Sequence, residues 1–491
     1  MSFKSLDFLI FFPVVIMLYF FLPHRWRWLW LLTASYYFYM CWKPVYALLL
    51  VATTLIDYWA GLQMGKESNK AKRKKFFLIS LVSNLGMLFF FKYYNFFFSS
   101  IGSLASQWNI LYQFPEMHVL LPVGISFYVF QSVGYSIDVY RGVKAPEKHP
   151  GIFALYVVFF PQLVAGPIER STHLLPQFYQ THDFDYRRVT DGLRLMAWGF
   201  FKKVVIADRL AVYVNASYNS PAGHTGLEFI LATVFFAYQI YCDFSGYSDI
   251  AIGAAKVLGF DLMQNFRSPF WATSVGDFWQ RWHISLSTWL RDYLYTPLSI
   301  WLRDLGIWGA MLALMITFVL CGLWHGPTWN FLVFGFLFGV ALCYELLTKK
   351  IWKKIWKRSP KFVATIVSIF CTFSFVCFAF IFFRANSMAD ALYIIKSIGD
   401  LLTTVMFRWH DLQGYHWMGY YQLEHPLRMI MVNFLWIAFL EGAYWLAQKR
   451  NVNVWISSRP WYVRWGVYYS ILAVIIFCGY FEESRFIYFQ F

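Results

Sequence analysis

Runs of apolar residues recur along almost the whole chain, and they constrain its fold more than any other feature. Several runs reach the roughly 20 residues that a helix needs to cross a bilayer. Charged residues make up 14% of the 491 residues and hydrophobic residues 59%, whereas a soluble protein carries about 25% charged residues. So little polar material cannot cover a water-exposed surface. The sequence therefore predicts an all-α, multi-pass integral membrane protein.

We expect roughly 11–14 membrane helices, with interfacial amphipathic helices beside them. The runs at 152–166 and 247–260 are short for a full span, so re-entrant or half-spanning segments are expected there. The run at 8–22 lacks the small-residue cleavage site of a signal peptide and is interpreted as a retained first span. The predicted apolar runs are 8–22, 28–42, 45–62, 76–98, 119–138, 152–166, 193–213, 226–242, 247–260, 308–322, 329–347, 362–383, 428–447 and 465–481.

The formal net charge of +16 is concentrated in short loops between apolar runs, among them 66–75, 349–361 and 448–460. This placement indicates cytosolic loops under the positive-inside rule, in contact with anionic membrane lipids, and argues against nucleic acid as a partner. The loop at 99–118 has no lysine or arginine. Alternation of the loops then places the N- and C-termini on the outer face.

The seven cysteines are scattered, mostly inside apolar runs, and no Cys-x-x-Cys pair or Cys/His metal spacing occurs. We therefore expect neither a disulfide framework nor a metal site. No repeat of 20–50 residues and no Gly/Ser linker is visible. The chain is predicted to form one transmembrane domain over residues 1–491.

The segment at 272–304 interrupts the apolar pattern and is predicted to be an amphipathic helix at the cytosolic interface or packed among other helices. Ser274 followed by Asp277 is a capping-box signature, which predicts that a helix begins there. Asp277 and Arg281 form an i,i+4 pair. An apolar stripe follows at helical spacing, and it consists of Phe278, Trp282, Leu286, Trp289 and Tyr293.

His325 lies inside a long apolar run, in the sequence GLWHGPTWNF. An ionisable group at membrane depth is costly, so we interpret it as functional, against the alternative of a ring that only packs and bonds a backbone carbonyl. Gly322, Gly326 and Pro327 interrupt the helix and would let a substrate approach the backbone closely. A neutral imidazole accepts the proton of an attacking hydroxyl near physiological pH. We predict that His325 is a general base.

His283 is the second candidate, either as a structural group that bonds across helices or as a substrate-channel group that serves His325. The tryptophans around the two histidines either line an acyl path or pack. Supporting or channel-lining roles are predicted for seven further residues, namely Asp243, Ser245, Gln280, Arg281, Trp324, Asn330 and Gln131.

Asp243 and Ser245 lie in an otherwise apolar region, and a buried acid there needs a partner. Arg267, Arg281 or a water-filled cavity would supply one. A polar network that holds helices together is the first interpretation. A Ser–His–Asp hydrolase built from Ser245, His325 and Asp243 is the alternative, but the nucleophile-elbow pattern is missing.

The sequence PQLVAGPIER at 161–170 contains two prolines and a glycine, which predicts a broken helix or a re-entrant turn. It ends in the acid–base pair Glu169 and Arg170. Gln131 lies inside a predicted span, and Arg384 lies at the outer end of another, where it is interpreted as a side chain that reaches the interface.

RWHISLSTWLRDYLY and CGLWHGPTWNF together resemble the membrane-bound O-acyltransferase (MBOAT) family. VGISFYVFQSVGYSIDVYRG, FFPQLVAGPIER, YCDFSGYSDIAIG, NFRSPFWATSVGDFW and FFRANS are similar to its bacterial alginate O-acetylation branch. The resemblance covers most of the chain and implies an MBOAT core at about 100–385, with C-terminal helices at about 386–491. The invariant histidine of the family falls on His325, and its earlier polar position falls on His283.

The resemblance implies an O-acyltransferase of the bacterial inner membrane without a permanently bound cofactor. Its donor would be cytosolic acetyl-CoA or another acyl-CoA. A periplasmic or extracellular acetyltransferase of the SGNH type would receive the acyl group and modify an exported or cell-surface polysaccharide, which is not identified. An acyl-histidine intermediate is an open alternative. Other functional alternatives are export of D-alanyl groups to teichoic acid, a polysaccharide transporter without acyl chemistry, and a scaffold.

Overall fold

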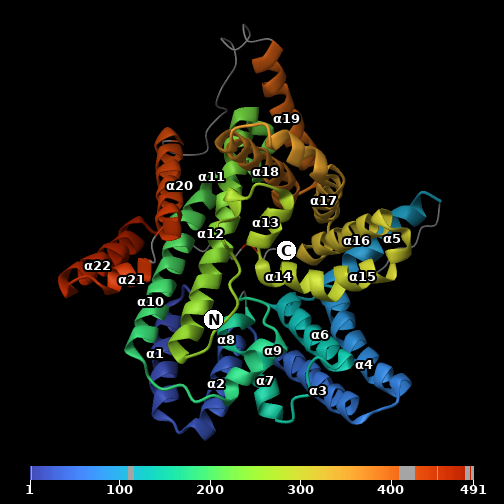
Figure 1. Cartoon of the computed structure of the whole chain (residues 1–491), viewed down its shortest axis with the longest axis vertical. Coiled ribbons are helices and arrows are strands. Elements are labelled where there is room, and N and C mark those ends of the chain that lie inside the picture. The colour runs from blue at the N-terminus through green and yellow to red at the C-terminus, as the bar shows by residue number, and fades with distance from the viewer. Residues whose placement is uncertain are drawn as a thin grey trace. The chain divides into compact units, whose positions relative to one another are not determined.

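The computed structural model of the chain describes residues 1, 3–108, 115–164, 166–407, 426–449, 452–481 and 487. These residues form helices and connecting loops, and no strand occurs among them. Residues 109–114 of the predicted loop at 99–118, and residues 450–451 of the basic loop at 448–460, lie outside the described residues. The chain divides into two compact units, which we describe separately (Figure 1).

Among the described residues, eight helices are long and apolar enough to cross a membrane, which confirms an all-α, multi-pass membrane protein. They are Val45–Lys66, Lys70–Ser106, Gly226–Leu258, Ile307–His325, Trp329–Trp356, Lys361–Arg384, Leu427–Lys449 and Trp461–Cys478. The apolar helix Leu6–Phe21 is shorter. Other predicted apolar runs form shorter helices or parts of longer ones.

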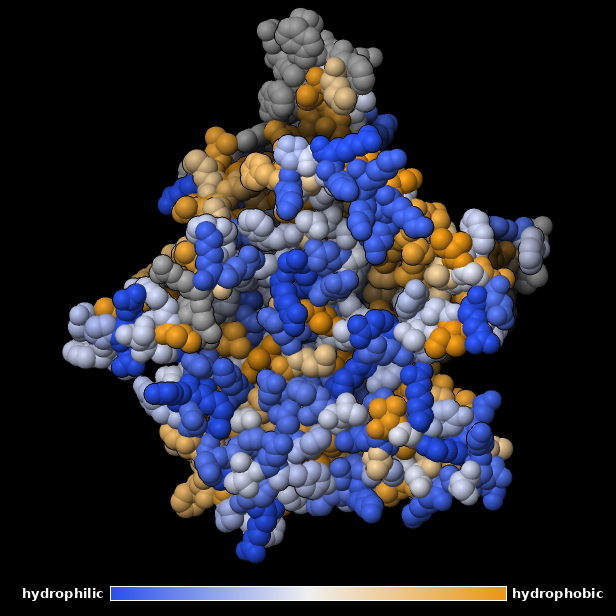
Figure 2. Space-filling model, viewed as in Figure 1, coloured by the Kyte–Doolittle hydropathy of each residue, from blue (hydrophilic) through white to orange (hydrophobic). Residues whose placement is uncertain are grey.

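Large hydrophobic side chains are exposed on the surface of the protein. Phe21 is 85% exposed, Phe477 84% and Phe362 75%. Figure 2 shows such hydrophobic areas in orange beside hydrophilic ones in blue. Apolar surface costs about 25 cal/mol per Å² in water. Lipid removes this cost, so the exposed side chains agree with a membrane location.

Unit 1 comprises residues 1–196, 247–264 and 288–294. Its helices are α1 (Leu6–Phe21), α2 (His24–Met40), α3 (Val45–Lys66), α4 (Lys70–Leu88), η1 (Phe89–Tyr93), α5 (Tyr94–Ser106), α6 (Ile125–Arg141), α7 (Pro150–Val158), α8 (Phe160–Leu163), α9 (Ser171–Leu174), η2 (Leu175–Tyr179) and most of α10 (Tyr186–Phe200). Helices α3, α4 and α6 pack against one another (Figure 1).

A buried polar cluster joins these three helices. The Asp57 carboxylate of α3 accepts hydrogen bonds from Ser80 Oγ (2.6 Å) and Asn84 Nδ2 (2.8 Å) of α4. Ser80 Oγ also lies 2.7 Å from Ser136 Oγ of α6. Polar groups inside a membrane must find partners within the protein. The cluster therefore stabilises the packing of α3, α4 and α6.

The two short apolar runs of the sequence have different outcomes. The run at 152–166 forms two short helices, α7 and α8, which are separated at Phe159; the re-entrant or half-spanning arrangement expected there stays a prediction. The run at 247–260 is not a half-span. It continues the run at 226–242 in the single helix α12 (Gly226–Leu258), because the polar residues between the two runs find partners inside the protein, as described below.

Unit 2 comprises residues 197–246, 265–287 and 295–491. Its further helices are η3 (Phe201–Ala207), α11 (Asp208–Asn219), η4 (Pro221–Gly223), η5 (Pro269–Trp271), α13 (Val275–Arg281), α15 (Thr296–Trp301), η7 (Arg303–Leu305), α16 (Ile307–His325), α17 (Trp329–Trp356), α18 (Lys361–Arg384), α19 (Met388–Phe407), α20 (Pro426–Lys449), α21 (Val452–Ser457) and α22 (Trp461–Cys478). Helices α14 (Ile284–Leu290) and η6 (Arg291–Tyr295) include residues of both units.

Helices α16 and α17 form a tightly packed hairpin (Figure 1). A Cβ atom added at Gly322 would collide with the carbonyl oxygen of Phe331 and would lie 3.0 Å from Cα of Gly335. One added at Gly326 would collide with the ring of Phe331. The prediction that these glycines let a substrate approach is therefore wrong, because the space beside them is filled by α17.

Candidate active site

His325 is the last residue of α16, and Gly326 after it has extended backbone. The helix therefore ends where the glycine and proline of the motif predict. His325 is 3% exposed. Its ring is enclosed by aromatic rings, with centroid distances of 5.0 Å to Trp324, 5.1 Å to Phe383 and 5.8 Å to Phe334. The imidazole is thus buried among side chains of α16, α17 and α18.

His283 lies between α13 and α14 and is 0% exposed. Its ring centroid is 4.6 Å from that of Phe244 and 5.8 Å from that of Trp324. Trp324 therefore contacts both histidines and places them in one aromatic site. Burial lowers the pKa of His283 well below its ordinary value of 6.5, and the nearby His325 lowers it further. His283 is accordingly neutral at physiological pH.

The predicted single helix over 272–304 is interrupted at His283, which differs from the expectation. His283 has a φ of 43°, in the left-handed region. The interruption is stabilised by the preceding segment, because the N–H of Arg267 donates to the Arg281 carbonyl (3.0 Å) and the N–H of Ile284 donates to the Asn265 carbonyl (2.9 Å). Periodicity alone does not reveal such pairing, since the apolar stripe continues across the break.

Helix α13 begins where the sequence predicts and has an additional support. The N–H of Asp277 donates to Ser274 Oγ (3.0 Å), which confirms the cap. The carboxylate of Glu345, on α17, accepts from the N–H of Val275 (2.5 Å) and of Gly276 (3.0 Å). Glu345 was not among the predicted supporting residues, although an acid inside an apolar run is a signal of such a role. It fixes the first turn of the helix that leads to His283.

Asn330 fixes another wall of the site. Its side chain is 5% exposed, and Nδ2 donates to the carbonyl oxygen of Ala385 (2.9 Å). This bond joins the start of α17 to the residue that follows α18. Phe383, two residues earlier, is thereby held against His325. The supporting role predicted for Asn330 stays a prediction, and this contact gives it a physical basis.

Asp243 belongs to a buried ionic cluster. Lys203 Nζ lies 2.5 Å from Asp243 Oδ1 and 2.7 Å from Asp208 Oδ1, and all three side chains are 2–3% exposed. The suggestion of Arg267 or Arg281 as the partner of Asp243 is wrong. The carboxylates of Asp243 and Asp208 flank the Lys203 ammonium and compensate its buried charge.

Ser245 pairs with Lys202, the residue next to Lys203 in η3. Lys202 Nζ donates to Ser245 Oγ (2.8 Å). Both side chains are buried. Together with the pair at Asp243, this contact explains why α12 continues through residues 243–246, because Asp243 and Ser245 each meet a lysine of η3 instead of lipid. The hydrolase alternative receives no support from this pairing, since Ser245 and Asp243 are bound by different lysines.

The C-terminal part of the chain also contacts this cluster. The N–H of Ile487 donates to Asp243 Oδ2 (2.8 Å), and Ile487 is 5% exposed. The N–H of Tyr480 donates to the Val204 carbonyl (2.8 Å). No pattern in the sequence predicts these contacts, which join residues more than 240 positions apart. They fix described residues after α22 on η3 and α12.

Two of the predicted supporting residues lie nearer the surface. Gln280 is exposed, at the end of α13. Arg281 Nε donates to Asp277 Oδ1 (2.7 Å), which confirms the predicted i,i+4 pair, and the two side chains are 34% and 25% exposed. The exposed position of Gln280 and the pairing of Arg281 with Asp277 do not bring either side chain against the two imidazoles, so the roles of both residues stay predictions.

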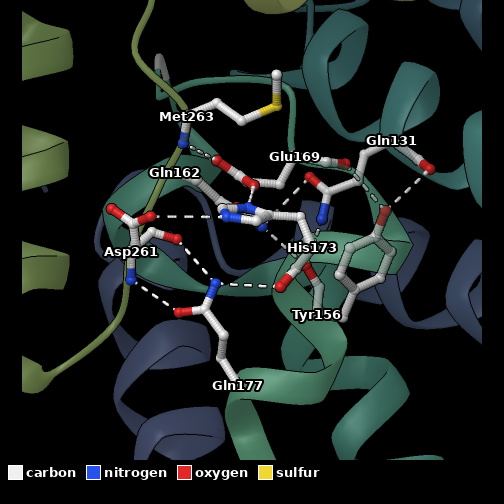
Figure 3. A network of polar contacts seen from close by, with 8 residues as sticks. All are labelled: Gln131, Tyr156, Gln162, Glu169, His173, Gln177, Asp261 and Met263. Atoms are coloured by element: carbon white, nitrogen blue, oxygen red, sulfur yellow. Dashed lines mark hydrogen bonds and ion pairs between the residues drawn. The ribbon is translucent and has the colours of Figure 1, made fainter.

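Gln131 lies in unit 1, in a different polar network (Figure 3). Its Nε2 donates to the carbonyl of Tyr156 (2.5 Å), and its Oε1 accepts from Gln162 Nε2 (3.2 Å). All three residues are buried. Gln131 therefore joins α6 to the broken segment formed by α7 and α8.

Glu169 lies against His173 in the same view (Figure 3). Arg170 pairs with Asp292, so the pair of Glu169 with Arg170 that the sequence suggested does not form. Glu169 Oε2 lies 2.8 Å from Nδ1 of His173, and its Oε1 accepts from the N–H of Met263 (2.6 Å). Burial raises the pKa of Glu169. The hydrogen bond to Glu169 raises the pKa of His173, which also lies 3.7 Å from Asp261. The pair fixes the segment after α12.

All seven cysteines are free. In the part of the chain that the structure describes, no group of three His, Cys, Asp or Glu residues is arranged to hold a metal ion. The candidate site itself consists of two buried imidazoles in an aromatic enclosure. Such an enclosure excludes bulk water, which protects a reactive ester or thioester from hydrolysis.

Comparison with known proteins identifies relatives over most of the chain. The family model described as MBOAT, membrane-bound O-acyltransferase family, matches residues 53–389. A probable alginate O-acetylase AlgI of Azotobacter vinelandii is 38% identical over 395 residues, which cover 79% of this chain and 76% of that protein. One of Pseudomonas putida is 40% identical over 348 residues, 70% of each chain. A peptidoglycan O-acetyltransferase of Helicobacter pylori is 32% identical over 400 residues, 76% of this chain and 74% of that protein.

Proposed function

The chain belongs to the membrane-bound O-acyltransferase family, and from this premise we propose that it transfers an acetyl group across the membrane for O-acetylation of an exported or cell-surface polysaccharide. The acyl transfer itself is supported by relatives that are named alginate O-acetylase and peptidoglycan O-acetyltransferase. These names differ in the polymer, so the proposal is limited to the class of acceptor.

The observation that carries the proposal is the meeting of His325 and His283 around Trp324. The two histidines are 42 positions apart in the sequence, and both are buried. A scaffold or a simple transporter gives no reason to bury two imidazoles side by side at a desolvation cost. A base that acts on a hydroxyl needs this enclosure, because water would otherwise compete for the acyl group.

In the proposed reaction, the oxygen of the acceptor hydroxyl attacks the thioester carbonyl while His325 accepts the hydroxyl proton. The C–O bond forms, the C–S bond breaks, and the proton passes from His325 to the departing thiolate. General base catalysis of this kind contributes about 10²–10⁴-fold. His283 is neutral, so it orients the donor or the acceptor by hydrogen bonding without adding a second positive charge beside His325.

The donor in this proposal is cytosolic acetyl-CoA, and it reaches the site from the face that carries the basic loops. The acceptor hydroxyl comes from the opposite face. A periplasmic or extracellular acetyltransferase of the SGNH type would supply this hydroxyl and then modify the polymer. The protein would lie in the bacterial inner membrane, with both termini on the outer face.

The test is acetyl transfer by the full chain in proteoliposomes, with radiolabelled acetyl-CoA outside and an acceptor polysaccharide with its partner enzyme inside. His325→Ala should lower the transfer rate by about 10²–10⁴-fold. His118→Ala, which removes an exposed imidazole to which no role is assigned, is the matched control and should leave the rate unchanged.

Full activity of His325→Ala would reject the proposed mechanism. If the wild-type chain moves polymer while the thioester stays intact, the protein is a transporter. If label moves only from a D-alanyl carrier protein, the chain exports D-alanyl groups. The first outcome rejects the role of His325, whereas the other two are recognised by what crosses the membrane, unmodified polymer or a D-alanyl group.

A further inference from the structure

Three arginines of unit 1 converge on Asp292, in the π-helical turn η6. Arg170 Nη2 lies 2.9 Å from Asp292 Oδ2, and Arg291 Nε lies 2.8 Å from Asp292 Oδ1. Arg141 Nη1, from the end of α6, donates to the Asp292 backbone carbonyl at 3.3 Å. One aspartate thus holds three guanidinium groups from three parts of the chain.

The three arginines differ in their exposure. Arg170 has a side chain that is 13% exposed, and its guanidinium lies 4.3 Å from the centroid of the Tyr293 ring. The Arg291 side chain is 62% exposed, and Arg141 is exposed as well. Arg170 therefore fixes Asp292 from the inside, and Asp292 in turn holds Arg141 and Arg291 together at the surface.

The two exposed guanidinium groups keep most of their hydrogen-bonding capacity. Each has five N–H donors. Within the described part of the chain, each makes one hydrogen bond to the protein, Arg291 through Nε and Arg141 through Nη1. The remaining N–H groups on both arginines are available to an acceptor-rich ligand.

The charges around this pair do not balance. The guanidinium groups of Arg141, Arg170 and Arg291 contact Asp292. The second carboxylate nearby is that of Asp138, which accepts from the hydroxyl of Tyr293 (2.8 Å). One positive charge is left over before any neighbouring loop is counted. An anionic ligand would neutralise it.

A basic segment at 66–75 reinforces this charge. It contains six lysines and arginines and one glutamate. Arg73 of this segment donates to the Val139 carbonyl on α6 (2.6 Å), two residues before Arg141. The segment runs from the end of α3 into the first turns of α4 (Figure 1), and the contact of Arg73 brings it beside Arg141. Its summed potential attracts phosphate, and the positive-inside rule assigns this face to the cytosol.

We propose that Arg141 and Arg291 bind the phosphate groups of the nucleotide end of an acyl-CoA donor. Planar guanidinium groups recognise phosphate through paired N–H donors, and two of them held together suit a ligand with several phosphates. The identity of the ligand rests on the proposed function, whereas the phosphate-binding chemistry rests on the arginines themselves.

The test measures equilibrium binding of CoA and of pantetheine, which lacks the nucleotide, to the full chain in neutral detergent micelles. The wild-type chain should bind CoA at least about 10-fold more tightly than pantetheine, equivalent to about 1.4 kcal/mol. The Arg141→Gln/Arg291→Gln variant should lose most of this preference and bind pantetheine unchanged. Arg358→Gln, at an exposed position of another basic loop, should keep it.

Equal affinity of the wild-type chain for CoA and pantetheine would overturn the inference, as would equal losses in the double variant and in Arg358→Gln. Micelles that contain phosphatidylglycerol test the lipid alternative, and binding of this lipid to the pair in preference to CoA also overturns it. Acetyl transfer with the same KM from acetyl-CoA and acetyl-pantetheine refutes the inference alone. Binding of CoA through the pair without any acetyl transfer refutes the proposed function alone.

Discussion

Replacement of Asp243 by asparagine removes one of the two carboxylates that neutralise Lys203. The change keeps the size of the side chain but removes its charge. Lys203 keeps Asp208 at 2.7 Å, and the N–H of Ile487 loses a charged acceptor at 2.8 Å. The expected result is a local loosening of η3, of the centre of α12 and of the contact between Asp243 and Ile487.

The magnitude follows from the burial of the cluster, whose side chains are 2–3% exposed. Breaking a buried ion pair costs about 3–5 kcal/mol. Asp208 still compensates Lys203, so we expect about 3 kcal/mol for Asp243→Asn. Lys203→Met should cost more, because two buried carboxylates lose the cation between them. The double variant should lose less free energy of unfolding than the sum of the losses in the two single variants, because both single changes remove the same Lys203–Asp243 ion pair.

Cys242 reports this loosening, because it is next to Asp243 and is 0% exposed. In a chain whose other six cysteines are replaced by serine, a thiol reagent reacts with Cys242 only when this region opens. A cost of about 3 kcal/mol corresponds to labelling that is about 100-fold faster. Asp304→Asn is the matched control, because Asp304 is 91% exposed and its pair with Arg303 is at the surface.

The reasoning is refuted if Asp243→Asn changes the labelling rate by less than about 5-fold, which is about 1 kcal/mol. It is also refuted if Lys203→Met and Asp243→Asn are additive in the double variant. Either result would mean that the three charged groups do not stabilise one another in the membrane.

Two further changes test the support of the site and of unit 1. Glu345→Gln replaces a charged hydrogen-bond acceptor at the first N–H groups of α13. A loss of about 1–2 kcal/mol is expected, so amide hydrogen exchange over 275–281 should become about 10-fold faster. Unchanged exchange there would contradict the capping role. His173 has a raised pKa because of its hydrogen bond with Glu169, so its contribution to stability is fully present below its ordinary pKa of 6.5 and is lost as pH rises through the raised value. The melting temperature of the wild-type chain should exceed that of His173→Gln most at about pH 5–6 and least at about pH 9, and a difference that grows with pH would disprove this sign.

Local patterns in the sequence predicted the features that depend on neighbouring residues. The apolar runs gave the membrane helices, and Ser274 with Asp277 gave the start of α13. The glycine and proline after His325 gave the end of α16. Each of these features is set by helical propensity, capping or burial within a few turns of chain, which is the range over which a sequence pattern carries information.

The features that the sequence did not reveal depend on partners far away in the chain. The division of α12 into two runs was wrong because Lys203, 40 positions earlier, neutralises Asp243. The break at His283 depends on Asn265, which supplies the acceptor for the N–H of Ile284. Both outcomes follow from the need of a buried polar group for a partner, but the sequence does not say which distant residue provides it.

The left-handed backbone at His283 has a consequence for which substitutions the position allows. Few residues with a side chain adopt a positive φ, and asparagine, aspartate and histidine are enriched among them. An aliphatic residue at 283 would strain the backbone and so destabilise the protein, in addition to removing the imidazole. The local backbone thus restricts substitution at this position. Asparagine, aspartate and histidine, which tolerate it best apart from glycine, each place a polar group near the ring of Trp324.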